Sequence, residues 1–333
     1  MKGMALHRPA PIEANPLTPV ELDTPELGPG EILVRVRTCG VCRTDLHVAE
    51  GDLPPHHPRI VPGHEVVGVV ERRGLGATRF APGARVGIAW LRYTCGACVY
   101  CRRGRENLCP NARFTGYDHD GGYAEVAVVH QDFAYGLPEG PGDEEIAPLL
   151  CAGIIGFRAL KRAEVKPGST LGLYGFGGSA HIAIQVARYW GCRVFVMTRG
   201  GRHRELAESM GADWVGPAEA RPPAPLDSAI LFAPAGEIVP PALEALDYGG
   251  ILAIAGIHLS PIPTLEYERH LFHEKELRSV TANTRADAEE FLALAARIPV
   301  RTHTVAFDLG QANQALQMLK HDEVKGAAVL RVS

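Results

Sequence analysis

The first 150 residues alternate short apolar stretches with polar breaks. The apolar stretches are rich in β-branched residues, and Gly and Pro separate them, which is typical of strands joined by turns. The predicted strands are Glu31–Arg37, Val66–Glu71, Ala84–Trp90 and Tyr123–His130. The pattern therefore predicts a mainly β region at the start of the chain.

Beyond residue 150 the pattern changes to alternating strands and helices. Continuous apolar runs predict buried strands, and apolar residues at helical spacing predict the helices between them. The predicted strands are Thr170–Tyr174, Arg193–Thr198, Ser228–Ala233, Gly250–Gly256 and Arg278–Thr281, and the predicted helices are Ala152–Ala163, Ser179–Tyr189, His203–Met210 and Ile238–Leu246. This alternation indicates a parallel sheet with helices on both faces, which is an α/β fold class.

The end of the chain, Thr304–Ser333, returns to strand-like runs around one helix, Gln311–Lys320. We expect this tail to pack back onto the first region. A chain of 333 residues is longer than one core usually holds, so two domains are expected. The first would span residues 1–150 and be completed by residues 286–333, and the second would span residues 151–285.

Charge and composition exclude several classes of partner. The formal net charge of −4 gives no reason to expect binding to nucleic acid or to an anionic membrane. No apolar run approaches the length that crosses a bilayer, and the first residues lack the apolar core of a signal peptide. The expected location is therefore the cytoplasm.

Four cysteines lie close together in Cys95-Gly-Ala-Cys98-Val-Tyr-Cys101, which is followed by Cys109. Thiolates at this spacing can surround a zinc ion as a closed tetrahedron, which makes a structural site. Two disulfides or free buried thiols are alternatives, although a third cysteine so close to a CxxC pair makes regular pairing awkward. An iron–sulfur cluster matches the spacing only in part. We predict structural zinc.

A second set of metal-binding residue types, Cys42, His64 and Cys151, is scattered along the chain. Two thiolates and one imidazole make a zinc site with a fourth position open to water or substrate. Cys151 precedes a helical stretch whose positive dipole end favours a thiolate. Asp45 and Glu65 are close enough in sequence to orient His64 and tune a metal. Buried structural cysteines and surface acids are the alternative interpretation, and spacing alone does not decide between the two.

A glycine-rich turn follows the predicted strand 170–174 and opens a predicted helix. Its sequence is Gly175-Phe-Gly177-Gly178-Ser-Ala180. Gly175 permits a tight turn, Gly177 lets the backbone approach a pyrophosphate, and the small Ala180 suits close packing of the helix on the strand. A flexible glycine turn is the alternative, but the strand and helix on either side favour dinucleotide binding.

Taken together and in this order, these motifs resemble those of the zinc-containing alcohol dehydrogenases in the medium-chain dehydrogenase/reductase superfamily. They include Gly-Val-Cys-Arg-Thr-Asp-Leu-His, Gly-His-Glu, the four-cysteine segment and Leu-Leu-Cys-Ala-Gly. The resemblance covers essentially the whole chain. It implies a GroES-like, mainly β catalytic domain, a Rossmann cofactor domain with a doubly wound parallel sheet, and an active site in the cleft between them.

The resemblance also implies a role for each matching residue. Cys42, His64 and Cys151 match ligands of a catalytic zinc, and Cys95, Cys98, Cys101 and Cys109 match ligands of a structural zinc. The other matches are Glu65 behind the metal, Asp45 supporting the ligand histidine, Thr44 and His47 as a proton relay, Arg43 and Arg285 as cofactor phosphate contacts, and Trp90 as a wall of the alcohol pocket. For Trp90, an ordinary buried aromatic residue is the alternative.

The implied function is the reversible oxidation of small primary alcohols, with secondary alcohols as a further option, by hydride transfer to a nicotinamide dinucleotide. Two zinc ions per chain and a homodimer or homotetramer are expected. Two competing classes are a non-enzymatic zinc- and dinucleotide-binding relative and a zinc-free quinone or enoyl reductase. Each should lack metal ligands or the relay, and this chain has Cys42, His64, Cys151, Thr44 and His47.

The choice of cofactor depends on the end of the predicted strand 193–198. NAD-preferring Rossmann domains carry an acid there that binds the ribose 2′-hydroxyl. This chain has Thr198 and then Arg199 instead. Because a guanidinium beside a hydroxyl suits a 2′-phosphate, NADP(H) is favoured, with NAD(H) also accepted.

Overall fold

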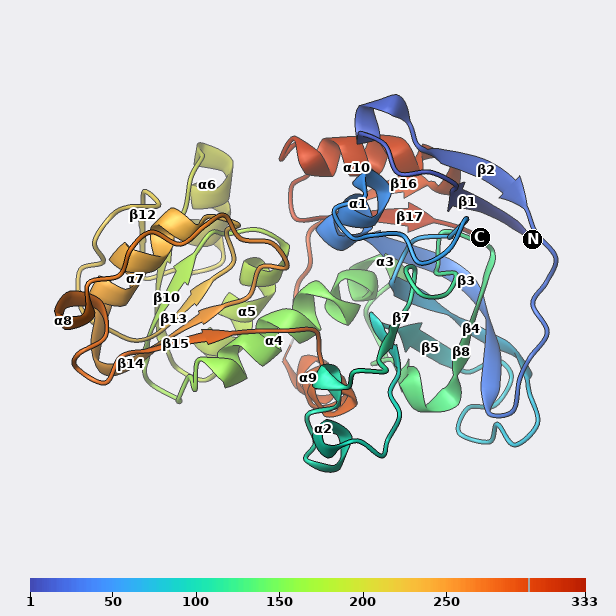
Figure 1. The fold of residues 1–333 in the computed structure, drawn as a ribbon, viewed down its shortest axis with the longest axis horizontal. Coiled ribbons are helices and arrows are strands. Elements are labelled where there is room, and N and C mark those ends of the chain that lie inside the picture. Colours follow the sequence, from blue (N-terminus) through green and yellow to red (C-terminus); the bar gives the residue numbers. More distant parts are fainter. Residues whose placement is uncertain (299) are drawn as a thin grey trace. The chain divides into compact units, whose positions relative to one another are not determined.

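The computed structural model describes residues 1–298 and 300–333, and within them the chain forms two compact units (Figure 1). Unit 1 comprises Met1–Cys151, Ala282–Ala296 and Arg301–Ser333, and unit 2 comprises Ala152–Thr281 and Arg297–Val300. Cys151 and residues 282–285, which the sequence interpretation assigned to the second domain, thus belong to unit 1. Unit 1 also takes in the end of the chain.

Unit 2 is built on a parallel sheet. Its strands in the described residues are β10 (Thr170–Tyr174), β11 (Arg193–Met197), β12 (Trp214–Gly216), β13 (Leu226–Leu231), β14 (Leu246–Ile254) and β15 (Glu276–Ser279). They lie in the order β12-β11-β10-β13-β14-β15, and every pairing is parallel. Numbered within the unit, this is the 3-2-1-4-5-6 order of the Rossmann fold, in which ligands bind where the order reverses.

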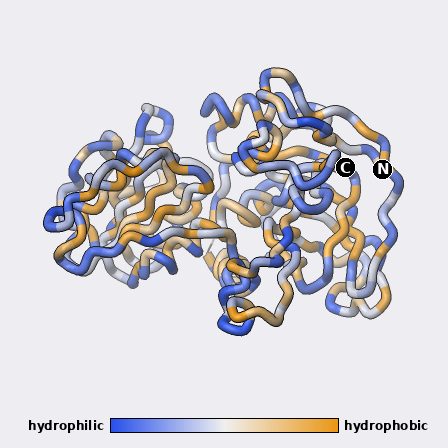
Figure 2. The backbone as a smooth tube through the Cα atoms, viewed as in Figure 1, coloured by the Kyte–Doolittle hydropathy of each residue, from blue (hydrophilic) through white to orange (hydrophobic). Residues whose placement is uncertain are grey.

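The helices of unit 2 alternate with the strands along the chain, and the central strands β10, β11 and β13 are largely buried because both faces of a parallel sheet are covered. Figure 2 shows hydrophobic stretches along these strands. The helices are α4 (Ala152–Arg162), α5 (Gly178–Tyr189), α6 (Gly201–Ser209), η5 (Gly236–Ile238), α7 (Val239–Ala245) and α8 (Tyr267–His270). Strand β12 was not predicted, since three residues are too few to show a period.

Unit 1 is mainly β. Its larger sheet has the order β16-β17-β3-β4-β5-β9, with β8 also paired to β3. The strands of unit 1 are β1 (Lys2–Leu6), β2 (Leu17–Glu21), β3 (Glu31–Val41), β4 (Glu65–Arg73), β5 (Arg85–Ile88), β6 (Leu91–Tyr93), β7 (Arg113–Phe114), β8 (Val126–His130), β9 (Ala134–Gly136), β16 (Thr304–Asp308) and β17 (Ala327–Arg331). Strand β17 comes from the end of the chain and pairs with β3, so the tail completes this sheet.

Strand β3 is longer than its sequence pattern indicated. The alternation of apolar and polar residues supports a strand only to Arg37, but pairing with β4 and β17 continues to Gly40 and Val41. Neighbouring strands therefore fix the last residues of β3, which lead directly into Cys42. This extension places a candidate metal ligand at the end of a buried central strand.

Most helices of unit 1 have only one or two turns, and α9 (Arg285–Arg297) is longer. The helices of this unit are η1 (Ile12–Ala14), α1 (Arg43–Glu50), α2 (Val99–Arg102), η2 (Glu106–Leu108), η3 (Gln131–Phe133), α3 (Asp143–Ile146), η4 (Ala147–Leu150), α9, η6 (Leu309–Gln311) and α10 (Ala312–Lys320). Helices α1 and α9 were not predicted. Among residues 1–298 and 300–333, no helix combines the length and the apolar character that a membrane-spanning helix needs.

Candidate functional site

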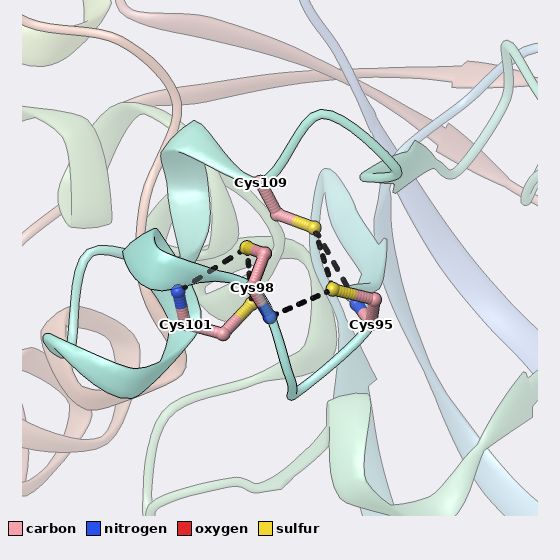
Figure 3. A group of neighbouring side chains, drawn as sticks. All are labelled: Cys95, Cys98, Cys101 and Cys109. Atoms are coloured by element: carbon pink, nitrogen blue, oxygen red, sulfur yellow. Dashed lines mark hydrogen bonds between the residues drawn. The ribbon is translucent and has the colours of Figure 1, made fainter.

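The four cysteines of the segment 95–109 converge, and their sulfur atoms face one another (Figure 3). Cys98 Sγ lies 3.5 Å from Cys101 Sγ, and Cys109 Sγ lies 3.5 Å from Cys95 Sγ. A disulfide would need about 2.05 Å, whereas thiolates around a tetrahedral zinc ion lie about 3.8 Å apart. All four sulfur atoms lie within 4.8 Å of one another, so the set fits a closed metal site.

The backbone of this segment is arranged to hold thiolates. The N–H groups of Cys98 and Cys101 donate to Cys95 Sγ and Cys98 Sγ over 3.3 and 3.5 Å, and these bonds are drawn in Figure 3. Backbone N–H groups of Ala97 and Cys98 lower the pKa of Cys95 to about 6. Burial raises the pKa of Cys101 to about 12, and contacts with Cys98 and Cys109 add to the rise. The thiols thus differ in how readily they lose their protons, and a divalent cation at the centre would hold all four as thiolates.

A second metal-binding group forms from residues far apart in the sequence: Cys42, His64, Glu65 and Cys151. Cys42 is the N-cap of α1. Its Sγ accepts a bond from the N–H of Thr44, and its own N–H donates to Asp45 Oδ2 over 2.9 Å. This reciprocal capping fixes the start of the helix and places the sulfur at its positive end.

His64 is fully buried and held in one orientation. Asp45 Oδ1 lies 2.9 Å from its Nδ1 and also accepts the N–H of Gly63 over 3.2 Å. Gly63 has φ +97, and a Cβ there would collide with the Tyr123 ring, so this turn requires glycine. His64 Nε2 has no hydrogen-bond partner among the described residues. A buried nitrogen without a partner is costly, and a metal ion would satisfy it.

Glu65 and Cys151 complete the group. The Glu65 carboxylate lies against Gly40, where a Cβ would come within 1.8 Å of Oε2, so β3 needs glycine at that position. Burial, and then the charge on Cys42, raises the pKa of Glu65 well above its usual value. Cys151 Sγ lies 3.8 Å from Cys42 Sγ, immediately before α4. The residues present therefore fit a zinc ion held by two thiolates and an imidazole, with Glu65 within reach.

The sulfur electrostatics agree with this assignment. A hydrogen bond from Cys151 lowers the pKa of Cys42 well below its usual value. The same hydrogen bond, burial and the charge on Cys42 raise the pKa of Cys151. Without a cation the pair favours one thiolate and one thiol, whereas a zinc ion holds both as thiolates.

The glycine turn of unit 2 links β10 to α5. Gly175 has φ +86, and a Cβ on it would lie 2.9 Å from the Ala233 backbone nitrogen, so the turn requires glycine. A Cβ on Gly177 would meet nothing within 4 Å, which leaves space at the start of α5. Gly178 opens this helix, and Ala180 is fully buried in it. Free N–H groups at the start of a helix suit a phosphate, so this turn fits a dinucleotide.

The residues expected to read the ribose lie at the end of β11. Thr198 is buried there, and Arg199 follows it with an exposed side chain. A guanidinium nitrogen of Arg199 lies 3.6 Å from Glu237 Oε1, and Ser260 Oγ donates to the other carboxylate oxygen over 3.1 Å. An acid from another element, Glu237 of η5, thus lies beside Arg199. Sequence spacing did not reveal this neighbour.

Known proteins resemble the chain in both sequence and structure. Residues 28–139 match the alcohol dehydrogenase GroES-like domain family, and residues 178–297 match the zinc-binding dehydrogenase family. A probable alcohol dehydrogenase of Mycobacterium tuberculosis is 57% identical over 100% of this chain and 97% of its own length. The chain belongs to the zinc-binding alcohol dehydrogenase family. This family lies within the medium-chain dehydrogenase/reductase superfamily that the motifs indicated.

Solved structures agree with this membership. A cinnamyl alcohol dehydrogenase of Sorghum bicolor has a TM-score of 0.89 and 30% identity, covering 99% of this chain and 97% of that one. A cinnamyl alcohol dehydrogenase of Helicobacter pylori, solved with NADP(H), has a TM-score of 0.88 and 25% identity, covering 99% and 97%. The GroES-like and Rossmann folds expected from the sequence are both confirmed.

In this alcohol dehydrogenase the two residues expected to relay protons lie on α1. Thr44 is mostly buried, and its Oγ1 lies 3.7 Å from Cys42 Sγ. His47 lies nearly one turn further along, with Nδ1 2.7 Å from Asp52 Oδ2 at the surface. Thr44 thus lies beside the group of Cys42, His64, Glu65 and Cys151. His47 is on the side of α1 that reaches solvent.

Trp90 lies beside the metal group. Its ring meets the His64 ring edge-on with centroids 5.0 Å apart, and it stacks on Phe114 with centroids 4.9 Å apart. The Tyr117 ring also stacks on the Trp90 ring, with centroids 6.1 Å apart. The ring is therefore fixed next to a candidate ligand, as a wall residue would be.

The two arginines expected to contact cofactor phosphates both have acidic partners. Arg43, at the start of α1, pairs with Asp322 at the surface. Arg285, the first residue of α9, is bound by Glu106, and its guanidinium lies 4.7 Å from the centroid of the Phe133 ring. The structure thus shows a contact for each guanidinium that the sequence interpretation did not include, and their phosphate roles stay predictions.

Two residues of the site were missed from the sequence. Tyr123 is fully buried and donates its hydroxyl to Asp45 Oδ2 over 3.3 Å, which helps to hold the acid that orients His64. Glu106 lies between Cys101 and Cys109 and is mostly buried. No signal in the sequence indicated the contact between Tyr123 and Asp45. The position of Glu106 between two candidate metal ligands was a signal that could have been followed.

Proposed function

We propose that this alcohol dehydrogenase oxidises small primary alcohols to aldehydes, and runs the reverse reduction, at the site of Cys42, His64 and Cys151. The observation that supports this most directly is the buried His64 Nε2, which has no hydrogen-bond partner in the described part of the chain and lies in one group with two thiols while Asp45 holds Nδ1. Three protein ligands leave a position for the alcohol oxygen. A second zinc would occupy Cys95, Cys98, Cys101 and Cys109.

Zinc at the open site would supply a Lewis acid that makes the alcohol hydroxyl more acidic, and the nicotinamide would accept the hydride from the alcohol carbon. Around that chemistry the protein has three tasks. Asp45 and Tyr123 fix the ring of His64, Trp90 limits the space beside it, and Glu65 adds a buried carboxyl behind the sulfurs. These are binding and orientation roles, in which small displacements cost much of the rate.

A proton must also leave the alcohol oxygen. Thr44 Oγ1 can accept it at the edge of the metal group and pass it on, because a hydroxyl is both donor and acceptor. His47 receives it at the other end and exchanges it with solvent, with Asp52 2.7 Å from its ring. Thr44→Ala should therefore lower kcat at neutral pH while the zinc content stays unchanged.

For the cofactor we propose NADP(H) as the favoured dinucleotide, with NAD(H) also accepted. Arg199 and the Thr198 hydroxyl suit a 2′-phosphate, and nothing acidic precedes Arg199 on β11. Glu237 works against this preference, because it draws on the same guanidinium and would repel a phosphate. Arg199→Ala should lower kcat/KM for NADP⁺ about tenfold and leave NAD⁺ little changed, whereas Glu237→Gln should raise the preference for NADP⁺.

We further propose that the active protein is a homodimer or homotetramer in the cytoplasm. Unit 2 exposes large aromatic side chains, with 74% of Tyr248, 65% of Tyr267 and 57% of Phe272 accessible. The ring centroids of Tyr248 and His273 lie 4.0 Å apart, those of His273 and Phe272 5.2 Å, and those of Phe272 and Tyr267 5.8 Å, so the rings form one patch. Light scattering on the purified protein would give the subunit count directly.

The deciding experiment is an initial-rate screen of short alcohols and aldehydes with both nicotinamide cofactors, alongside metal analysis of the same preparation. We expect activity on small primary alcohols, with two zinc ions per chain. Activity that survives full removal of zinc would contradict the proposed chemistry. A strong preference for NAD⁺ would contradict only the cofactor assignment.

A further inference from the structure

A carboxylate stands inside the four-cysteine segment without belonging to the group of four sulfur atoms. Glu106 begins η2, between Cys101 and Cys109, and its side chain is only 11% exposed. Both of its oxygens are bound by Arg285. The backbone N–H of Arg285 donates to Oε1 over 2.8 Å, Nε lies 3.1 Å from both oxygens, and a terminal nitrogen donates to Oε2 over 2.7 Å.

The neighbours of this pair also belong to the cysteine segment and to α9. Thr94, which precedes Cys95, donates to Glu106 Oε2 over 3.4 Å. A surface pocket beside the pair is lined by Cys101 and Gly104 on one side and by Ala286 and Glu289 of α9 on the other. Burial by itself would raise the pKa of Glu106, but hydrogen bonds from Arg285 outweigh it and hold the pKa below its usual range. The pair is therefore a stable charged contact between two elements.

Arg285 stands at a special place along the chain. The backbone passes from unit 2 back into unit 1 between Thr281 and Ala282, and α9 begins three residues later. Ala282 has φ +46, a left-handed conformation that costs a non-glycine residue free energy and needs support from its surroundings. Thr284 is bound by Asp287 through its N–H and its hydroxyl, over 2.9 and 2.8 Å. Glu106 holds this re-entry point to another part of unit 1 through hydrogen bonds from the Arg285 backbone and guanidinium, beside the Phe133 ring that the guanidinium also contacts.

We propose that Glu106 is a positioning residue that couples metal binding at the four cysteines to the order of the chain where it re-enters unit 1. The coupling rests on the proposed zinc at Cys95, Cys98, Cys101 and Cys109. Metal ligands stand on both sides of Glu106 in the chain, so a bound ion fixes its backbone and aims the carboxylate at Arg285. Loss of the ion increases the mobility of residues 101–109, so the contact between Glu106 and Arg285 weakens and the start of α9 opens more often.

Such coupling is reciprocal. If the metal stabilises the contact between Glu106 and Arg285, the contact must stabilise the bound metal by the same free energy. Breaking the pair from the α9 side should therefore weaken the hold on zinc, although Arg285 is no ligand. A role for Glu106 confined to local folding of the cysteine segment would not produce this effect.

The first test is hydrogen–deuterium exchange of the zinc-loaded protein, read at Asp287 and Ala288, with α10 as an internal reference. Cys98→Ser removes a metal ligand, and we expect it to speed exchange at these amides at least about tenfold. Glu106→Gln should do the same while the zinc content stays at two. Adding Cys98→Ser to Glu106→Gln should then change the rate less than about twofold, since the coupling is already broken.

A matched control breaks a different ion pair on the same helix. Arg79 binds Glu289 of α9 over 2.9 Å. Unlike Glu106, neither residue of this pair stands between two cysteines of the four-cysteine group in the chain. In an Arg79→Gln background, Cys98→Ser should keep its full effect on exchange. If Cys98→Ser leaves the exchange of α9 unchanged, or speeds it equally with and without Glu106, the coupling does not exist.

A second measurement remains informative if Cys98→Ser does not fold. In a Cys42→Ser background only the four-cysteine zinc should remain, and its transfer to a chromogenic chelator can be timed. Arg285→Gln should speed this transfer about threefold to tenfold, and Arg79→Gln should not. An unchanged rate in Arg285→Gln would overturn the coupling. Absence of zinc from this background would instead contradict the proposed second zinc.

Discussion

The two candidate metal-binding groups of unit 1 arrange their thiols in opposite ways. In the four-cysteine group the outermost ligands are 14 residues apart, and backbone N–H groups of the same segment bond the sulfurs. In the other group Cys42 and Cys151 are 109 residues apart, and His64 is fully buried. One group is closed by a local loop, whereas the other exists only when separate strands and helices meet.

We propose that this difference gives the two groups different tasks. Four thiolates leave no position for a substrate, so metal at Cys95, Cys98, Cys101 and Cys109 can only stabilise the structure. Two thiolates and an imidazole leave a position open, and the fold supplies Asp45, Trp90 and Thr44 around it. Variants of each group should therefore separate activity from stability.

The largest effect is expected from Cys42→Ser. Loss of a ligand at the open group should remove one zinc and lower kcat/KM at least about 1,000-fold, because a Lewis acid stabilises the transition state by several kcal/mol. The melting temperature should change little. Cys39→Ser, which alters a buried thiol outside both groups, is the control and should keep both zinc ions. Retained activity in Cys42→Ser would mean that the open group is not the reaction site.

Cys98→Ser should act on stability first. A closed metal site contributes folding free energy directly, so its loss should cost about 3 kcal/mol and lower the Tm by about 10 °C. Residual activity per folded molecule should remain measurable. The matched control is Cys192→Ser in unit 2, a buried thiol outside both metal groups. Equal shifts of Tm in the two variants would contradict a structural role of the four-cysteine group.

Asp45→Asn tests how far the orientation of His64 contributes to metal binding at the open group. An amide cannot hold the His64 ring as strongly as a carboxylate, so zinc affinity at the open group should fall about 10-fold to 100-fold. The four-cysteine zinc should be unaffected. Asp118→Asn breaks a similar bond of 2.8 Å to His56, which belongs to neither group, and should leave both affinities unchanged. Competition with a metal chelator measures the two sites separately.

Trp90→Ala should give the smallest effect, a change of specificity. Removing the indole opens space beside His64, so kcat/KM for hexanol relative to ethanol should rise about tenfold. This is within the range of discrimination that one contact in an apolar pocket usually gives, about 10-fold to 200-fold. Trp90→Phe keeps an aromatic wall of smaller size and should fall between the two. If the ratio is the same in all three proteins, Trp90 serves only to pack against Phe114.

Much of the fold could be predicted from periodicity. The strands of unit 2 were placed closely because a buried parallel strand is a continuous apolar run, as in β10, where all five residues are buried. Helix α1 was missed because its eight residues are mostly polar and its start depends on Cys42 and Asp45 capping each other. Strand β3 was cut short because its last residues are strand-like only through pairing with β17 and β4.

The sequence by itself determined which chemistry the chain carries. Local motifs need only a loop or a turn to work, so the four cysteines and the glycine turn could be interpreted from spacing and from the conformations that glycine allows. Only the tertiary structure decided which distant side chains meet. Asp45 with Tyr123, Arg285 with Glu106, and Arg199 with Glu237 are contacts between segments far apart in the chain. Their closeness depends on how strands pair and helices pack, and local sequence does not encode that distance.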